Sequence, residues 1–145
     1  MFGKGTKLWR PELSNIGDCE IGEDCTLHSH IWIGDGVKIG SRVRIEAFSF
    51  LPPGITIEDD VFIGPRVTFT NDKYPPSSKW GITMVCRGAS LGAGVIVLPQ
   101  IIIGEYAMIG AGSVVTKSVP PYEVWFGNPA RCYRDMRETL HAAGL

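Results

Sequence analysis

The sequence predicts an all-β fold in which short strands wind into stacked triangular coils. Two observations point to it: a hydrophobic repeat of six residues, and eighteen Gly and ten Pro in a chain rich in Ile and Val. A period of six fits neither an α-helix nor an alternating strand, whereas a short strand plus a bend repeats with that length. The 145 residues, 44% hydrophobic and 20% charged, suffice for one domain with one core.

The repeat starts at Ile21 and returns at every sixth residue as far as Phe69. The residues of this run are Ile21, Leu27, Ile33, Ile39, Ile45, Leu51, Ile57, Ile63 and Phe69. The period resumes at Val85, and a second series of mostly small or β-branched residues lies four positions after each member. Since three six-residue steps close one triangle, residues 21–69 and 85–119 should form about five coils. Parallel hydrogen bonds should stack these coils about 4.8 Å apart.

Residues 70–84 should leave the coils as a protruding loop, because the sixteen residues from Phe69 to Val85 are not a multiple of six. Long excursions from a rigid repeat commonly serve binding or assembly. Asn71 and Asp72 in this loop can accept hydrogen bonds from an amine, and the Asn71 amide can also donate one. An Asn-Asp pair is also a common turn former, so the residues alone leave both interpretations open.

The two ends of the single domain, residues 1–20 and 120–145, should cap the coils. Three prolines follow Val119 and remove backbone donors, so the repeat should end near that residue. From residue 130 onward, charged and apolar residues alternate in a pattern that predicts a short helix covering the last coil.

Charge and composition argue against several functional classes. A net charge of -1 provides no basic field that would hold nucleic acid. The N-terminal stretch lacks the apolar core of a signal peptide and no eighteen apolar residues run together, so we expect a cytoplasmic protein without membrane insertion. The four cysteines have neither C-x-x-C pairing nor zinc-finger spacing, and predict thiols rather than a disulfide framework or a structural metal.

The repeat pattern resembles that of the hexapeptide-repeat acyltransferases: a large aliphatic residue, then a small or acidic one, and a small or β-branched residue three positions later. That resemblance implies a left-handed parallel β-helix, a homotrimer and acyl-CoA sites between neighbouring chains. The strings GAGSVVTKSVPP (residues 110–121) and GNPAR (residues 127–131) are shared by many such enzymes. The narrower string FTNDKYP (residues 69–75) resembles the branch that N-acetylates nucleotide-linked 3-amino sugars for surface polysaccharides.

By this resemblance, Asn71 and Asp72 face the acceptor amine and, with Tyr74, contact the substrate, and His30 is a further catalytic candidate. The acyl donor, acetyl-CoA, would extend along late coils where small residues allow close approach, and cations would meet its phosphates. The residues expected to contact it are Gly92, Ala93, Gly110, Ala111, Lys117 and Arg131.

The histidines admit more than one interpretation. Of His28, His30 and His141, only two lie inside the repeat, so the three-histidine zinc site of carbonic anhydrases on this fold is not expected, and neither is any other metal. His30 either belongs to the active site or occupies a turn or an interface, and His28 should be structural.

The leading hypothesis is an acetyl-CoA-dependent N-acetyltransferase that acts on a UDP- or dTDP-linked amino sugar as a cytoplasmic homotrimer. One alternative keeps the acyl donor but acetylates a hydroxyl group, with His30 as the base. Another is a β-helical trimeric scaffold without enzymatic activity, in which the loop is an assembly contact.

Overall fold

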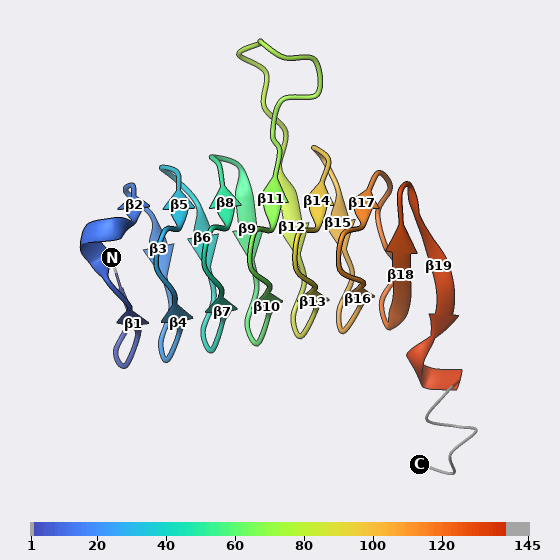
Figure 1. Cartoon of the computed structure of the whole chain (residues 1–145), viewed down its shortest axis with the longest axis horizontal. Helices are drawn as coiled ribbons and strands as arrows, with labels where there is room; N and C mark the ends of the chain where they lie inside the picture. Colours follow the sequence, from blue (N-terminus) through green and yellow to red (C-terminus); the bar gives the residue numbers. More distant parts are fainter. Residues whose placement is uncertain (1, 139–145) are drawn as a thin grey trace.

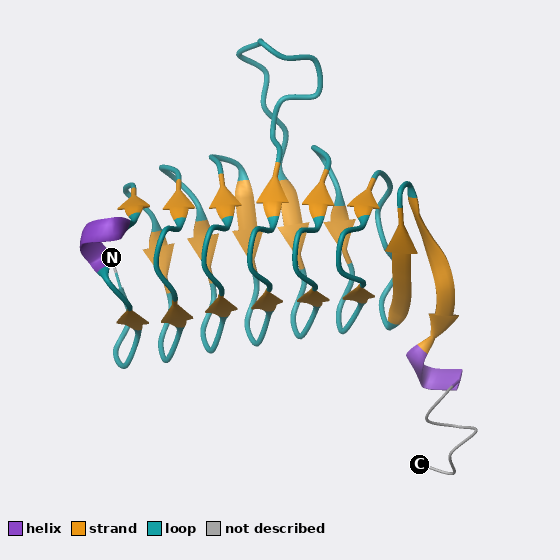
Figure 2. Cartoon of the chain, in the orientation of Figure 1, coloured by secondary structure: helices purple, strands orange, loops and turns teal. Residues whose placement is uncertain are grey.

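Very short strands joined by tight turns wind into a parallel β-helix (Figures 1 and 2). The computed structural model describes residues 2–138. Strand partners lie one coil apart, so that Ile21 is opposite Ile39, eighteen residues further along the chain. The predicted fold class is therefore confirmed.

Three sheets form the walls of the triangular prism. Wall I consists of β1 (Lys7–Leu8), β4 (Thr26–Leu27), β7 (Arg44–Ile45), β10 (Phe62–Ile63), β13 (Ser90–Leu91), β16 (Met108–Ile109), β18 (Glu123–Gly127) and β19 (Ala130–Asp135). Wall II consists of β2 (Asn15–Ile16), β5 (Trp32–Ile33), β8 (Phe50–Leu51), β11 (Thr68–Phe69), β14 (Ile96–Val97) and β17 (Val114–Val115). Wall III consists of β3 (Glu20–Ile21), β6 (Lys38–Ile39), β9 (Ile55–Ile57), β12 (Thr83–Val85) and β15 (Ile102–Ile103).

The apolar residues of the repeat fill the prism. In wall I, Leu27, Ile45, Ile63 and Leu91 lie in register and expose no surface. The first residue of most strands points outward, which explains the alternation of exposed and buried positions. Each coil buries its apolar edges against its neighbours, and this packing explains the six-residue period of the sequence.

The coils begin earlier in the chain than the repeat suggested. Backbone pairing joins β1 to β4 and β2 to β5, so part of the expected N-terminal cap forms the first coil, and wall I contains seven parallel strands rather than about five. Leu8 and Ile16 pack against the core. Ile16 follows Leu8 by eight positions, with the 3-10 helix η1 (Pro11–Leu13) between, so the first coil does not keep the six-residue spacing.

The C-terminal end also differs from the prediction. The strands do not end at Val119, because β18 adds in parallel to β16 and β19 then folds back antiparallel to β18. Residues 130–135, expected to begin a helix, form β19, and only residues 136–138 turn helically. The remainder of the expected helix, including His141, lies outside the described residues.

Between β11 and β12 the chain leaves the coils as the expected loop, at the top of Figure 1. Ile57 is opposite Val85, twenty-eight residues further on instead of eighteen, so this coil contains ten additional residues. No disulfide joins the four cysteines, all of which lie in the described part of the chain. Within residues 2–138, no helix has the length and apolar character needed to cross a membrane.

Candidate functional site

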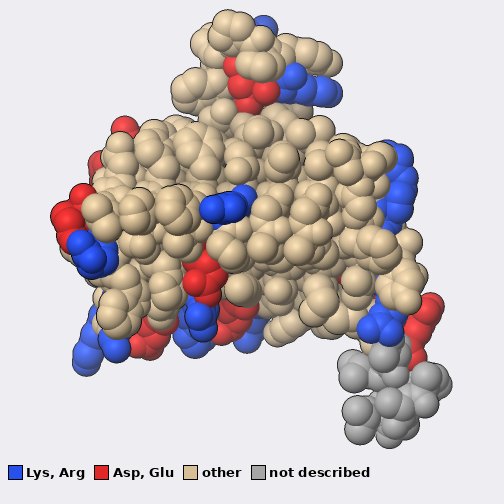
Figure 3. All heavy atoms as spheres, in the orientation of Figure 1, with Lys and Arg blue, Asp and Glu red and all other residues tan. Residues whose placement is uncertain are grey.

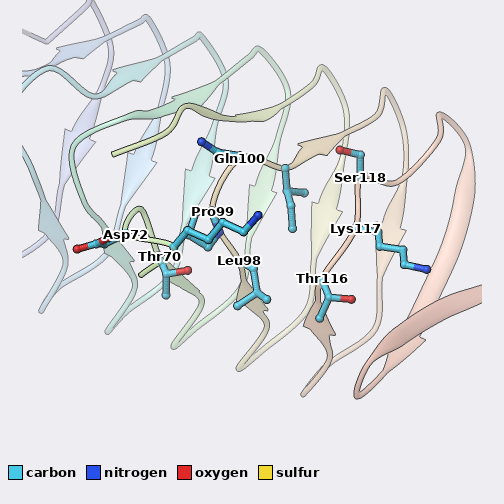
Figure 4. Close-up of a pocket in the computed structure, with 10 residues that line it drawn as sticks. Thr70, Asp72, Leu98, Pro99, Gln100, Thr116, Lys117 and Ser118 are labelled. Atoms are coloured by element: carbon cyan, nitrogen blue, oxygen red, sulfur yellow. The ribbon is translucent and has the colours of Figure 1, made fainter. Parts of the chain in front are cut away.

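A pocket of about 420 Å³ opens where the loop leaves the coils, at the corner between walls II and III (Figure 4). We call it the loop-base pocket. Its lining residues are Thr70, Asp72, Lys73, Leu98, Pro99, Gln100, Ile101, Thr116, Lys117 and Ser118. Apolar side chains with a few hydroxyl, amide and charged groups are typical of sites for small polar molecules. The pocket contains two of the predicted site residues, Asp72 and Lys117.

Asn71 forms the first foot of the loop. Its side-chain Nδ2 donates a hydrogen bond to the carbonyl oxygen of Pro53 at 2.8 Å, and its own carbonyl accepts one from the Gly81 amide at 3.3 Å. The Asn71 side chain is absent from the lining of the loop-base pocket. Its amide therefore ties the loop to the preceding coil, and its side-chain oxygen remains the group that could face a ligand.

The second foot of the loop is fixed by close packing. A Cβ added at Gly81 would collide with the side chain of Gln100 on the following coil. A Cβ added at Gly54 on the preceding coil would lie only 2.6 Å from the Gly81 carbonyl oxygen, and Gly54 has a φ of +100°. The Thr83 amide donates to the Gly54 carbonyl at 3.0 Å. Both feet of the loop are thus held by the coils on either side.

Asp72 is the best-satisfied side chain of the loop. Its carboxylate accepts hydrogen bonds from the Ser77 hydroxyl at 2.7 Å, the Ser77 amide at 2.6 Å and the Tyr74 amide at 3.3 Å. The Ser77 hydroxyl, followed by the two amides, holds the pKa of this carboxyl below its ordinary value, and the opposing effect of desolvation is not sufficient to raise it. Asp72 is therefore suited to hold a cation rather than to take up a proton.

Tyr74 lies away from the loop-base pocket. Its side chain is 77% exposed, and the Lys73 ammonium lies 5.6 Å from the centroid of its ring. Trp80, on the returning strand of the loop, is 55% exposed, and its indole N–H donates to the Ser77 carbonyl at 3.0 Å. Within one chain, the loop presents two aromatic side chains to its surroundings rather than to its own pocket.

His30 lies at a different corner, between β4 and β5, where walls I and II meet. It adopts a left-handed φ of 59°, and its ring stacks on that of Phe48 with centroids 4.7 Å apart. Its Nδ1 lies 3.0 Å from the Ser29 hydroxyl. On the other side of Phe48, one coil further along, the Arg66 guanidinium lies 5.8 Å from the centroid of the Phe48 ring. The loop follows β11 at the corner of walls II and III, so a single chain does not bring His30 to Asp72.

The four small residues expected to contact acetyl-CoA stack at this same corner of walls I and II. A Cβ at Gly92 would lie 2.7 Å from the Ala111 amide nitrogen, and one at Gly110 would lie 2.8 Å from the Phe126 Cβ. Gly92 is therefore required by the backbone of the next coil, and Gly110 by the Phe126 side chain. Ala93, which belongs to the same turn as Gly92, is exposed.

The corner between walls I and II carries large side chains before the loop and glycines after it. In three successive coils before the loop it carries His30, Phe48 and Arg66, whereas Gly94 and Gly112 take the equivalent left-handed turn positions after it. A Cβ at either glycine would meet no atom within 4 Å. We call the open strip along Gly94 and Gly112 the bare corner. Neither glycine was predicted as a site residue, although the positions one coil apart in the sequence show that both replace larger side chains.

The two predicted cations lie apart. Lys117 lines the loop-base pocket, but Figure 4 shows its ammonium and the Asp72 carboxylate pointing away from each other. Arg131 lies on β19 at the end of the prism, where its Nη1 donates to the Ala130 carbonyl at 2.9 Å. Neither forms an ion pair with another described residue.

Several polar residues of the site were missed. Thr70, Gln100, Thr116 and Ser118 line the loop-base pocket, and Ser77 binds Asp72. Only Ser77 had a local signal, because aspartate often caps a turn through a residue a few positions later. Within residues 2–138, no group of three His, Cys, Asp or Glu side chains is arranged to hold a metal ion.

The repeat of this chain is shared with a known protein family. A family model described as bacterial transferase hexapeptide (six repeats) matches residues 36–71 and 83–117, the coils on either side of the loop. The chain belongs to the hexapeptide-repeat transferase family. The expected membership is confirmed, and the interruption of the match coincides with the loop.

Two curated relatives and one solved structure illustrate the range of the hexapeptide family. A dTDP-3-amino-3,6-dideoxy-alpha-D-galactopyranose 3-N-acetyltransferase from Aneurinibacillus thermoaerophilus is 56% identical over 52 residues, 36% of this chain and 27% of the relative. A galactoside O-acetyltransferase from Lactococcus lactis is 33% identical over 140 residues, 83% of this chain and 64% of the relative. The chain thus spans less than two thirds of either relative.

The solved structure is a variant of AntD, an N-acyltransferase from Bacillus cereus, in complex with dTDP and coenzyme A. It superposes with a TM-score of 0.81 at 21% identity and covers 99% of this chain and 91% of that chain. At this identity the likeness supports the hexapeptide fold alone.

Proposed function

We propose that this chain is an acetyl-CoA-dependent N-acetyltransferase acting on a UDP- or dTDP-linked amino sugar. The observation that carries the proposal is the Asp72 carboxylate, held ionised by three hydrogen bonds on a loop whose two feet are fixed. An anion held in this way suits a protonated amine. The stretch shared with a dTDP-amino-sugar 3-N-acetyltransferase supports this acceptor class.

In the proposed reaction the bound ammonium first loses one proton to water. The neutral amine nitrogen then attacks the thioester carbonyl carbon, the carbon–sulfur bond breaks, and coenzyme A leaves as a thiolate. The nitrogen loses a second proton to the departing thiolate or to water as the amide forms. Asp72 binds and orients the amine, because the lowered pKa of its carboxyl makes it a weak base. Orientation alone can supply about 7 to 11 kcal/mol of barrier reduction in favourable cases, so a strong base is not required.

The donor is proposed to lie along the bare corner, where the absence of side chains at Gly94 and Gly112 allows an extended chain to approach the backbone. Lys117 and Arg131, with no ion-pair partner among the described residues, are proposed to meet its phosphates. Acetyl-CoA is supplied in the cytoplasm, which is where we propose that the reaction takes place.

We further propose that the site forms between copies in a homotrimer. Asp72 and the bare corner occupy different corners of one prism, so they can meet only if two chains pack side by side. Wall II carries the partly exposed apolar residues Trp32, Phe50 and Ile96, which a neighbouring chain would cover. The face seen in Figure 3 carries few charged side chains across the middle of the prism.

The loop and the start of the bare corner also lie at the same height along the prism. The corner changes from Arg66 to Gly94 across the same coil that contains the loop. Rotation about an axis parallel to the prism moves a feature sideways without changing its height, so the loop of one copy would lie level with the start of its neighbour's bare corner.

The direct experiment mixes the purified protein with acetyl-CoA and UDP- or dTDP-linked amino sugars, and measures released thiol and N-acetylated product. A folded protein that releases no thiol with any amino-sugar nucleotide and gives no saturable heat with acetyl-CoA would indicate the scaffold instead. For the shared site, an Asp72→Asn chain and a Gly112→Phe chain, each expected to be much less active than the wild type at low acetyl-CoA concentration, are refolded together and assayed at that concentration. Equal mixing should restore about a quarter of the activity, since one interface in four receives both intact residues. No recovery would place the site within one chain.

A second candidate is O-acetylation of a hydroxyl group with His30 as the base. It is favoured by the match to a galactoside O-acetyltransferase, which extends over 83% of this chain. His30 is exposed and stacked on Phe48, so its imidazole is accessible to a ligand. Turnover with a sugar hydroxyl but not with any amine would favour this candidate.

A further inference from the structure

Ser77 is the centre of the hydrogen bonding in the loop. Its hydroxyl donates to Asp72 Oδ1 at 2.7 Å, and its amide donates to Asp72 Oδ2 at 2.6 Å. The same hydroxyl accepts a hydrogen bond from the Lys79 amide at 3.2 Å, and the Ser77 carbonyl accepts one from the Trp80 indole at 3.0 Å. A single residue thus joins the carboxylate to the returning strand of the loop.

Counting hydrogen-bond sites shows what this arrangement leaves for a ligand. An ionised carboxylate offers about four acceptor positions. Ser77 fills two of those on Asp72 and the Tyr74 amide fills a third. About one position remains open, which is what a single amine nitrogen requires.

We propose that Ser77 is the positioning residue for Asp72: it turns both carboxylate oxygens so that one acceptor position faces the amine of the sugar substrate. This inference rests on the proposed function and adds a residue that neither the repeat nor the loop motif had indicated. Ser77 acts through Asp72 and does not itself touch the reacting atoms.

Two lysines line the same pocket as Asp72, Lys73 on the loop and Lys117 on the coil two turns later, and neither forms an ion pair with it. The lowered pKa of the Asp72 carboxyl arises instead from the hydrogen bonds of Ser77 and Tyr74. Removal of the Ser77 hydroxyl leaves both lysines in place but also removes the acceptor of the Lys79 amide, so a variant that restores the hydroxyl is needed beside Ser77→Ala.

The test compares Ser77→Ala, Ser77→Thr and Ser78→Ala in the full chain. Ser77→Ala keeps the amide bond to Asp72 and loses the hydroxyl bond, so kcat/KM for the amino-sugar nucleotide should fall about tenfold. The KM for acetyl-CoA should not change. Ser77→Thr should restore activity, and Ser78→Ala, a neighbouring exposed serine with no hydrogen bond to Asp72, should behave as wild type.

The pH profile separates positioning from a general loss of loop structure. Without the hydroxyl donor the pKa of Asp72 should rise, so the acid limb of kcat/KM should move to higher pH in Ser77→Ala and return in Ser77→Thr. A fall in activity that is equal at all pH values would overturn the inference, as would wild-type behaviour of Ser77→Ala when Asp72→Asn is inactive. Full activity of Asp72→Asn would instead refute the role proposed for the carboxylate itself.

Discussion

The contact between Gly81 and Gln100 offers a quantitative test of how the loop is fixed. Gly81→Ala places a Cβ against the Gln100 side chain, 2.7 Å from Nε2 and 2.8 Å from Cδ, with Cγ closer still. Overpacking of this kind costs about 1 to 3 kcal/mol. Gln100 is exposed and can swing toward solvent, so we expect the lower part of this range, about 1 to 2 kcal/mol, in the free energy of unfolding measured with urea.

A double-mutant cycle isolates the contact from other effects. Gln100→Ala removes all three atoms that the new Cβ would meet, so Gly81→Ala should cost little in that background and the coupling should be about 1 kcal/mol. Gly36→Ala is the matched control, because a Cβ at Gly36 meets no atom within 4 Å and its cost arises from a φ of +77°. Its effect should add to that of Gln100→Ala. An equal cost of Gly81→Ala in both backgrounds would refute the packing account.

Three further predictions concern the site and the coils. Asp72→Asn should lower kcat/KM for an amine acceptor about a hundredfold because the amine is no longer oriented, whereas His30→Ala should change kcat/KM less than about threefold. Thiol release measures both variants, and a larger loss in His30→Ala than in Asp72→Asn would favour a hydroxyl acceptor. Gly112→Phe should weaken acetyl-CoA binding in calorimetric titration at least about tenfold, and its left-handed backbone should lower the free energy of unfolding by about 1 to 2 kcal/mol. Unchanged affinity would argue against the bare corner as the acetyl-CoA site. Arg42 bonds Asp60 at 2.7 Å and holds the pKa of its carboxyl below the ordinary value, so the pair stabilises the fold at neutral pH and less as pH falls through the aspartate range. Arg42→Gln should therefore flatten the acid loss of stability in pH-dependent unfolding.

The coils were predictable because every inward position meets the same kind of neighbour one coil away. Ile45 and Ile63 face each other in wall I, so one apolar spacing recurs for as long as the coil length stays constant. Leu8 and Ile16 belong to the same walls, yet their spacing is irregular and periodicity could not find them. The strand β19 was mistaken for a helix, because its pairing with β18 depends on a contact across a turn rather than on its own pattern.

The site was only partly predictable for a related reason. Asn71 and Asp72 stand in a segment that breaks the period, and that break is visible in the sequence. Their hydrogen-bond partners, Pro53 and Ser77, are set by which coil the loop rests on and by how its turn closes. Spacing along the chain therefore located the loop, whereas only the fold could show that the Asn71 amide is engaged with the backbone.

A strictly periodic prism repeats one surface along its length and so offers a ligand no preferred coil. Selectivity for a ligand must therefore arise where the period is interrupted, and it is interrupted twice across one coil. Ten additional residues leave the wall after β11, and the corner between walls I and II carries no large side chain after Arg66. The first change adds an ionised carboxylate, and the second removes bulk so that a backbone becomes accessible. Because the two changes lie at different corners, neither alone would complete the proposed site, and association of copies would be a condition for the proposed activity rather than only a means of burying apolar surface.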